Sequence, residues 1–190
     1  PPYKFFLLVS ALFFLTAGLV FLRRILLQNA SDIITAMVLT AFVIGTNLYW
    51  YTLYQGTMSH VYSFALISAF IWYSIKWHNN GERKDWPAAR LGLIFGLITL
   101  IRPTNFIIVL FFLLYGIAPA GSLRRRGREM VADYRLLAVM ALAAFMVWIP
   151  QMIYWKEMTG QWLFFSYGSN EQFFFGDPAI LKGLFSWRKG

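Results

Sequence analysis

The chain has 190 residues, of which 59% are hydrophobic, 19% are aromatic and only 13% are charged. Soluble domains of this size carry about 25% charged residues, so the composition excludes an ordinary soluble enzyme and favours a helical membrane protein. No cysteine and only two histidines are present, which excludes a disulfide framework, a thiolate metal site and a histidine-rich metal site. The chain begins at Pro1 without a methionine, and we expect it to be a piece of a longer protein.

The net charge of +9 comes mainly from three clusters of basic residues that each border an apolar run. This placement is typical of cytoplasmic loops in membrane proteins. We therefore attribute the charge to topology and lipid headgroups, and we expect no nucleic-acid partner. Eleven of the 17 lysines and arginines form these clusters: Arg23 and Arg24; Lys76, Arg83, Lys84 and Arg90; and Arg124, Arg125, Arg126, Arg128 and Arg135.

Four apolar runs reach the roughly 17–25 residues that a transmembrane helix needs. If the basic clusters are cytoplasmic, the N-terminus lies outside, and successive spans cross the membrane alternately inward and outward. Ser31 or Asp32 is expected to cap the second helix, whose outer end carries the aromatic cluster of Tyr49, Trp50, Tyr51 and Tyr54. The predicted spans are 5–22, 33–54, 61–77 and 136–155, and the whole of 1–155 forms the predicted transmembrane domain.

Residues 91–118 are apolar except for Arg102-Pro103-Thr104-Asn105 in their middle. Basic loops flank the stretch on both sides, so it must enter and leave the membrane at the same face. Its arms, 91–101 and 106–118, would be about 16 and 20 Å long as helices, against a hydrocarbon core of about 30 Å. We predict a short helical hairpin with its tip at 102–105. The alternative, one kinked helix, would place 124–128 outside.

The hairpin tip is expected to be held firmly. Pro103 disfavours helical backbone at Arg102, and Thr104 or Asn105 is expected to cap the second arm. Three glycines are expected to allow close packing against neighbouring helices: Gly92, Gly96 and Gly116.

Arg102 is the strongest functional candidate, because an ionisable side chain inside a membrane usually marks a functional site. Its planar guanidinium suits phosphate oxygens, so it would bind the phosphate of a lipid-linked donor. The alternative is an arginine that reaches the interface or pairs with a carboxylate elsewhere, and the chemistry alone favours neither. His60, at the outer end of the third span, is a candidate acceptor contact or general acid–base, although a lone interfacial histidine more often caps a helix.

The segment 156–190 is predicted to lie outside as an aromatic-rich segment in the membrane interface, with short helices over 161–175. Glu171 could orient an acceptor hydroxyl there, or it could be a solvated carboxylate in a turn.

The stretch from Gly92 to Thr104, GLIFGLITLIRPT, with the apolar helix after it, resembles the GLA-x-LT-[RK]-P segment of GT-C membrane glycosyltransferases. The most similar members are those of the protein O-mannosyltransferase and lipid A aminoarabinose transferase superfamily. The order of the elements and the aromatic segment 150–175 are also similar, so the resemblance covers most of the chain, although its motifs are short and degenerate. It implies an all-α, polytopic transmembrane bundle of the GT-C type.

The resemblance also implies a function. Members of this family move a sugar from a polyprenyl-phosphate donor to a protein or lipid acceptor on the outer, periplasmic face, and the donor-phosphate residue maps onto Arg102. The family's catalytic acid lies in an external loop that has no counterpart here, so no catalytic residue is identifiable. The stretch with Tyr167, Asn170 and Glu171 is similar to one that carries a Glu-His pair in aminoarabinose transferases. Here Gln172 replaces the histidine, which weakens any metal role, and a divalent metal is expected at most in the full-length protein.

Two other classes of function stay open at this stage. Transporters and flippases also use broken helices and buried charge, but the internal repeats typical of them are not evident. A non-catalytic membrane scaffold is the other alternative. We expect a multi-pass protein of the bacterial inner membrane in each case.

Overall fold

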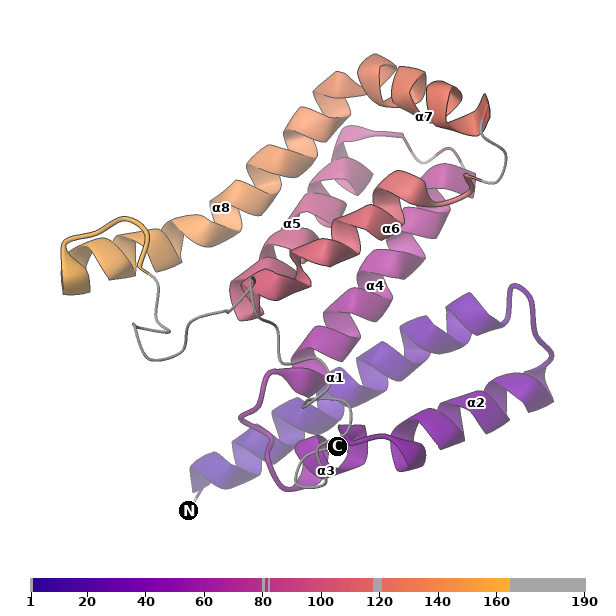
Figure 1. Ribbon diagram of the computed structural model, residues 1–190. Coiled ribbons are helices and arrows are strands. Elements are labelled where there is room, and N and C mark those ends of the chain that lie inside the picture. The colour runs from indigo at the N-terminus through magenta and orange to yellow at the C-terminus, as the bar shows by residue number, and fades with distance from the viewer. Residues whose placement is uncertain (1, 80, 82, 118–120, 165–190) are drawn as a thin grey trace, which may run out of the picture. The chain divides into compact units, whose positions relative to one another are not determined.

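The computed structural model describes residues 2–79, 81, 83–117 and 121–164. Over these residues all regular structure is helical and no strand occurs, which confirms the predicted all-α class. The chain divides into two compact units after Gln151, and each is described by itself. In chain order the elements are α1 (Pro2–Leu26), α2 (Asp32–Gly45), α3 (Leu48–Leu53), α4 (His60–Asn79), α5 (Asp85–Ile101), the 3-10 helix η1 (Pro103–Ile108), α6 (Val109–Leu114), α7 (Gly121–Ala132) and α8 (Tyr134–Thr159) (Figure 1).

Helices α1 and α4 pack side by side and run in the same direction (Figure 1). The rings of Phe14, in the middle of α1, and Tyr62, near the beginning of α4, lie 4.9 Å apart. Further along both helices the rings of Phe21 and Tyr73 lie 5.6 Å apart. Gly18 lies at the contact, where a Cβ atom would come within 2.5 Å of a ring on α4. The basic end of α1 therefore points the same way as the basic end of α4.

The predicted second span, 33–54, is two helices rather than one. Helix α2 ends at Gly45, and Thr46 adopts an extended conformation with φ −120° and ψ 168°. The Thr46 hydroxyl donates to the Phe42 carbonyl at 2.7 Å and accepts from the Leu48 amide at 3.2 Å. It therefore closes one helix and begins the next. With 14 residues, α2 extends about 21 Å and is too short to cross the hydrocarbon core alone.

The chain reverses direction at Arg102, as the sequence predicts. Arg102 is extended, with φ −148° and ψ 111°, because the following proline disfavours helical backbone there. The second arm then runs along α4. The Asn105 amide donates to the Ser63 hydroxyl at 3.3 Å near the start of α4, and the Asn79 amide donates to the Tyr115 hydroxyl at 3.1 Å near its end.

Three details of the hairpin differ from the prediction. The first arm, α5, begins at Asp85 and has 17 residues, and the second arm is a 3-10 helix followed by one short α-helix. No side chain caps the second arm, because the Asn105 side chain bonds to α4 instead. Gly116 does not serve close packing. Its φ of +75° belongs to the turn that ends the hairpin, and among the described residues a Cβ there would meet only the Arg126 guanidinium, at 3.7 Å.

Helix α8 packs along α5 in the same direction. Arg135 pairs with Asp85 at 3.2 Å at the beginning of both helices, and the Trp148 indole donates to the Thr99 hydroxyl at 3.1 Å further along. Both helices therefore begin at the end of the unit where the basic residues gather. This arrangement contradicts a single kinked helix in place of the hairpin, because such a helix would separate the two basic loops.

Two glycines allow α5 and α8 to approach closely, as the sequence predicts. A Cβ at Gly92 would collide with the Met140 carbonyl, and a Cβ at Gly96 would lie 2.7 Å from the Ala144 carbonyl oxygen. Backbone atoms cannot rotate away as a side chain can, so only glycine fits at these two positions.

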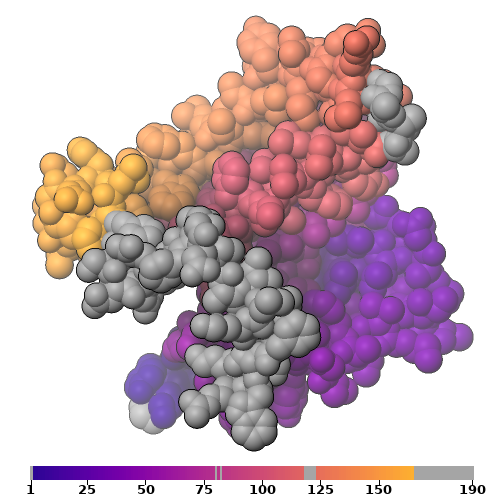
Figure 2. Space-filling model, in the orientation of Figure 1, coloured from indigo at the N-terminus to yellow at the C-terminus, as the bar shows by residue number. Residues whose placement is uncertain are grey.

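The basic stretch predicted as a loop, 119–135, contains the helix α7. Its charges support the helix, because Glu129 pairs with Arg125 at 3.5 Å and with Arg126 at 3.1 Å, at helical spacings of four and three residues. The side chains of α7 form part of the molecular surface in Figure 2.

Among the described residues, two helices are long and apolar enough to cross a membrane, α1 and α8. Their length and composition are compatible with a membrane-associated protein.

In the second unit, α8 ends at Thr159, and Gly160 has φ +74°. Lys156 donates to the Gly160 carbonyl at 2.9 Å and lies 5.8 Å from the centre of the Trp162 ring. Residues 161–164 are not helical, and the rest of the predicted interfacial segment lies outside the described residues.

Candidate functional site

Arg102 lies at the hairpin tip with its side chain exposed. Its backbone amide donates to the Ile98 carbonyl at 3.2 Å, and its carbonyl accepts from the Asn105 amide at 2.9 Å. The backbone is therefore held from both arms while the guanidinium stays accessible. Within the described part of the chain, no carboxylate forms an ion pair with Arg102.

His60 is the other predicted site residue among those that the structure describes. It is the first residue of α4, just outside the predicted span 61–77, and its ring stacks on Tyr51 with the centroids 3.9 Å apart. Burial, and to a smaller degree the positive charge of Arg102, lowers the pKa of His60. The bond between Asn105 and Ser63 ties the hairpin tip to the same end of α4.

The hairpin tip therefore carries a permanent cation, Arg102, and the end of α4 to which the tip is bonded carries His60, whose lowered pKa favours the neutral imidazole. Arginine offers five donors and no acceptor, whereas neutral His60 has one donor and one acceptor. Such a pair suits an anion with several oxygens, such as a phosphate, because the guanidinium binds two oxygens while the imidazole can exchange a proton. The other candidate contacts, Tyr167, Asn170 and Glu171, lie outside the described residues.

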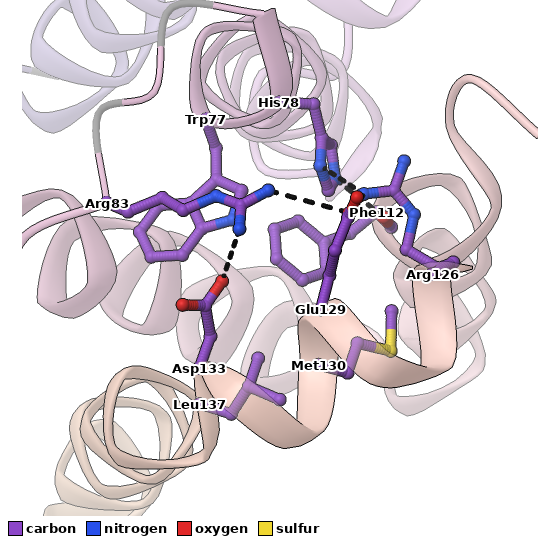
Figure 3. Close-up of a pocket in the computed structure, with 9 residues that line it drawn as sticks. All are labelled: Trp77, His78, Arg83, Phe112, Arg126, Glu129, Met130, Asp133 and Leu137. Atoms are coloured by element: carbon purple, nitrogen blue, oxygen red, sulfur yellow. Dashed lines mark hydrogen bonds and ion pairs between the residues drawn. The ribbon is translucent and has the colours of Figure 1, made fainter. Parts of the chain in front are cut away.

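A second polar cluster, which sequence reasoning missed, joins α4, α6 and α7 at the basic end of the first unit (Figure 3). The His78 Nε2 atom lies 2.9 Å from the Phe112 carbonyl oxygen, and its Nδ1 atom lies 2.8 Å from Arg126 Nη1. A carbonyl can only accept and an arginine can only donate, so the geometry assigns a neutral His78 with its proton on Nε2. Arg126 also donates to the Tyr115 carbonyl.

Acidic residues complete the cluster. Glu129 lies 3.1 Å from Arg126 and 3.5 Å from Arg83, and Arg83 pairs with Asp133 at 2.9 Å. The space between these side chains is only about 10 Å³, barely room for one water molecule. We conclude that this cluster fastens α7 to the hairpin and is not a ligand site. The only local signal in the sequence is the spacing of three residues between Arg126 and Glu129, which predicts their ion pair but not the contact with His78.

Stability of this cluster should depend on pH. Burial is the main cause that lowers the pKa of His78, and the charges of Arg126 and Arg83 add to it against the opposing effects of the Phe112 carbonyl and Glu129. A lowered folded-state pKa means that the unfolded chain binds the proton more readily. Stability is therefore lost as pH falls below about 6.5, the ordinary histidine value.

The expected result is faster amide hydrogen exchange in 121–132 at pH 5 than at pH 7.5, after correction for the intrinsic pH dependence of exchange. The variant His78→Gln, which keeps a donor and an acceptor but does not titrate, should show no such difference. An equal pH response in both proteins would contradict a role for His78.

An apolar cavity of about 360 Å³ lies between the hairpin arms, α4 and the first part of α8. Its size lies within the range of ligand pockets, and its lining offers a hydrocarbon chain contacts without any charged group. The lining residues are Phe70, Leu91, Gly92, Phe95, Val109, Phe112, Leu113, Leu137, Met140, Ala141 and Ala144.

Over the described residues, no group of three or more histidine, aspartate and glutamate side chains is placed to hold a metal ion. Comparison with known proteins adds no assignment. No family model matches the chain, and neither the curated proteins nor the solved structures include a significant match.

Proposed function

We propose that this chain is part of an integral membrane glycosyltransferase that moves a sugar from a polyprenyl-phosphate donor to a protein or lipid acceptor on the outer face. Arg102 binds the donor phosphate, and His60 contacts the reacting groups beside it. One observation carries the proposal. Arg102 is exposed at a hairpin tip between apolar helices, and no described carboxylate pairs with it. The bond between Asn105 and Ser63 holds this tip at the end of α4 that begins with His60. The GT-C resemblance of the stretch around Arg102 supports the same assignment.

The proposal includes a multi-pass arrangement in the bacterial inner membrane. Helices α1 and α8 have the length and apolarity of transmembrane helices. Helix α4 runs alongside α1, and the hairpin enters from the basic end, because α5 and α8 both begin there. Basic residues then lie on the cytoplasmic side, and the tip with Arg102 points toward the outer side.

The absence of native cysteines makes this topology directly testable with single cysteine substitutions. Leu123→Cys on α7 should react with a membrane-impermeant maleimide only after the cells are permeabilised. Tyr54→Cys, at the exposed end of α3, should react in intact cells. Labelling of Leu123→Cys in intact cells would refute the hairpin topology.

Binding of the donor's phosphate is the direct test of the function. The full-length protein should bind polyprenyl phosphate more tightly than the corresponding polyprenol, by about tenfold or more, because charge-assisted hydrogen bonds to phosphate contribute about 1.5–3 kcal/mol. Arg102→Ala should remove this difference and leave polyprenol binding unchanged. Equal binding of the two lipids by the wild-type protein would favour the alternative of a non-catalytic scaffold.

A further inference from the structure

Helix α7 has two opposite faces, each formed by residues at helical spacings of three and four. One face consists of Arg126, Glu129 and Met130, which line the cluster with His78, together with Asp133 in the turn directly after the helix (Figure 3). The other consists of Arg124, Gly127, Arg128 and Val131, which border a shallow, open depression. Side chains three and four residues apart share one side of a helix, so the two sets point in opposite directions.

On the face of α7 toward the His78 cluster, which we call the inner face, the charged side chains are paired. Arg126, whose side chain is only 14% exposed, bonds to His78 and Glu129, and Asp133 pairs with Arg83. These contacts hold α7 in one orientation, so its outer face has a defined direction.

The outer face has unmatched positive charge beside exposed apolar side chains. Arg124 and Arg128 are exposed one turn apart, and no carboxylate of the described residues pairs with either. No atom of the described residues lies within 4 Å of a Cβ placed at Gly127, so their side chains leave the depression between the two arginines open. Val131, which borders the depression, is 73% exposed, and Leu123, in the first turn of the same helix, is 55% exposed. Part of the α7 surface is seen in Figure 2.

We propose that this outer face binds the headgroups of anionic phospholipids at the cytoplasmic surface of the membrane. The two arginines would bind the phosphate, Gly127 would leave room for the headgroup, and the two apolar side chains would contact the acyl boundary. Arginines near a membrane surface attract anionic headgroups, and exposed aliphatic side chains beside them can enter the boundary between headgroups and acyl chains. An acidic protein would match the charge but not the aliphatic side chains. The inference requires a membrane-embedded chain and is independent of the transferase activity.

The experiment compares phosphatidylglycerol with phosphatidylcholine bound to the purified full chain, counted by native mass spectrometry. Wild-type protein should retain phosphatidylglycerol preferentially. In the double variant Arg124→Gln/Arg128→Gln, the ratio of bound phosphatidylglycerol to bound phosphatidylcholine should fall by roughly fivefold for each arginine removed. The reason is that a surface arginine contributes about 1 kcal/mol to the binding of anionic lipid. The matched control is Arg23→Gln/Arg24→Gln, which removes the same charge from another basic loop and should keep the preference.

Two control experiments distinguish a lipid site on α7 from a site for free phosphate and from the proposed donor site. Soluble glycerophosphoglycerol should fail to displace the lipid; displacement by it would show a free-phosphate site instead and overturn the proposal. The α7 double variant should keep the wild-type difference between polyprenyl phosphate and polyprenol binding, so the outcome is distinguished from that of the proposed donor site. Equal losses in the two double variants would show a net-charge effect, and an unchanged α7 variant would show no site; either result overturns the proposal.

Discussion

Replacing Gly92 by alanine should lower the free energy of unfolding by about 3 kcal/mol, at the upper end of typical overpacking costs. The added Cβ would collide with the Met140 carbonyl and lie 2.9 Å from the Ala143 methyl group. The carbonyl belongs to the backbone of α8, so relief requires the two helices to separate and the packing of Leu91 in the core to be lost. Thermal unfolding of the purified protein in detergent would measure the change.

Gly127 provides the matched control, because it is also a glycine inside a helix but has nothing within 4 Å of an added Cβ. Alanine there should stabilise the protein by roughly 0.5–1 kcal/mol, through the helix propensity that glycine lacks. Unfolding of Gly92→Ala at the wild-type temperature would contradict the close packing of α5 on α8.

Long apolar runs predicted three of the helices with small errors at their ends. The predicted 5–22, 61–77 and 136–155 correspond to α1, α4 and α8, which are longer by one to four residues at each end. The runs were delimited where polar or charged residues begin, whereas a helical backbone continues through such residues. The predicted cap at Ser31 is confirmed, since its hydroxyl accepts from the Ile34 amide at 3.4 Å.

Features that depend on side-chain contacts were not predictable in the same way. Thr46 ends α2 because its hydroxyl competes for backbone groups, but a threonine in an apolar run does not always do so. The Asn105 side chain could either cap the second arm locally or bond to a distant residue. The folded structure shows the second, a hydrogen bond to Ser63, and the sequence does not distinguish the two. The cluster around His78 joins residues 34 and 48 positions apart, which no local pattern reveals.

The residues of the candidate site stay a prediction from the sequence. The charge of Arg102 in an apolar stretch and the position of His60 at the end of a predicted span were visible there, whereas the bond that ties the hairpin tip to the start of α4 required the reversal of the chain at Arg102. The GT-C relationship and the polyprenyl-phosphate donor stay predictions, which turnover measurements can test.

Arg102→Ala should reduce donor turnover in the full-length protein by about a hundredfold, because two charge-assisted hydrogen bonds to phosphate contribute about 1.5–3 kcal/mol in total after desolvation. Folding should be unchanged, since the exposed guanidinium has no ion pair within the described residues. The backbone bonds of Arg102 to Ile98 and Asn105 do not depend on the side chain. Turnover of a lipid-linked sugar and the unfolding temperature should be measured on the same preparation.

Arg102→Lys separates charge from geometry. Lysine keeps the positive charge but lacks the planar fork, so turnover should fall by only about tenfold. The control variant is Arg24→Ala, which removes an exposed arginine from the last turn of α1, at the basic end of the unit. It should leave turnover unchanged. If well-folded Arg102→Ala turns over donor at the wild-type rate, Arg102 does not bind the phosphate. If the variant instead loses its folded structure, the arginine is a structural residue that pairs with an acid outside the described residues, and the lysine variant should then restore folding without restoring a phosphate preference.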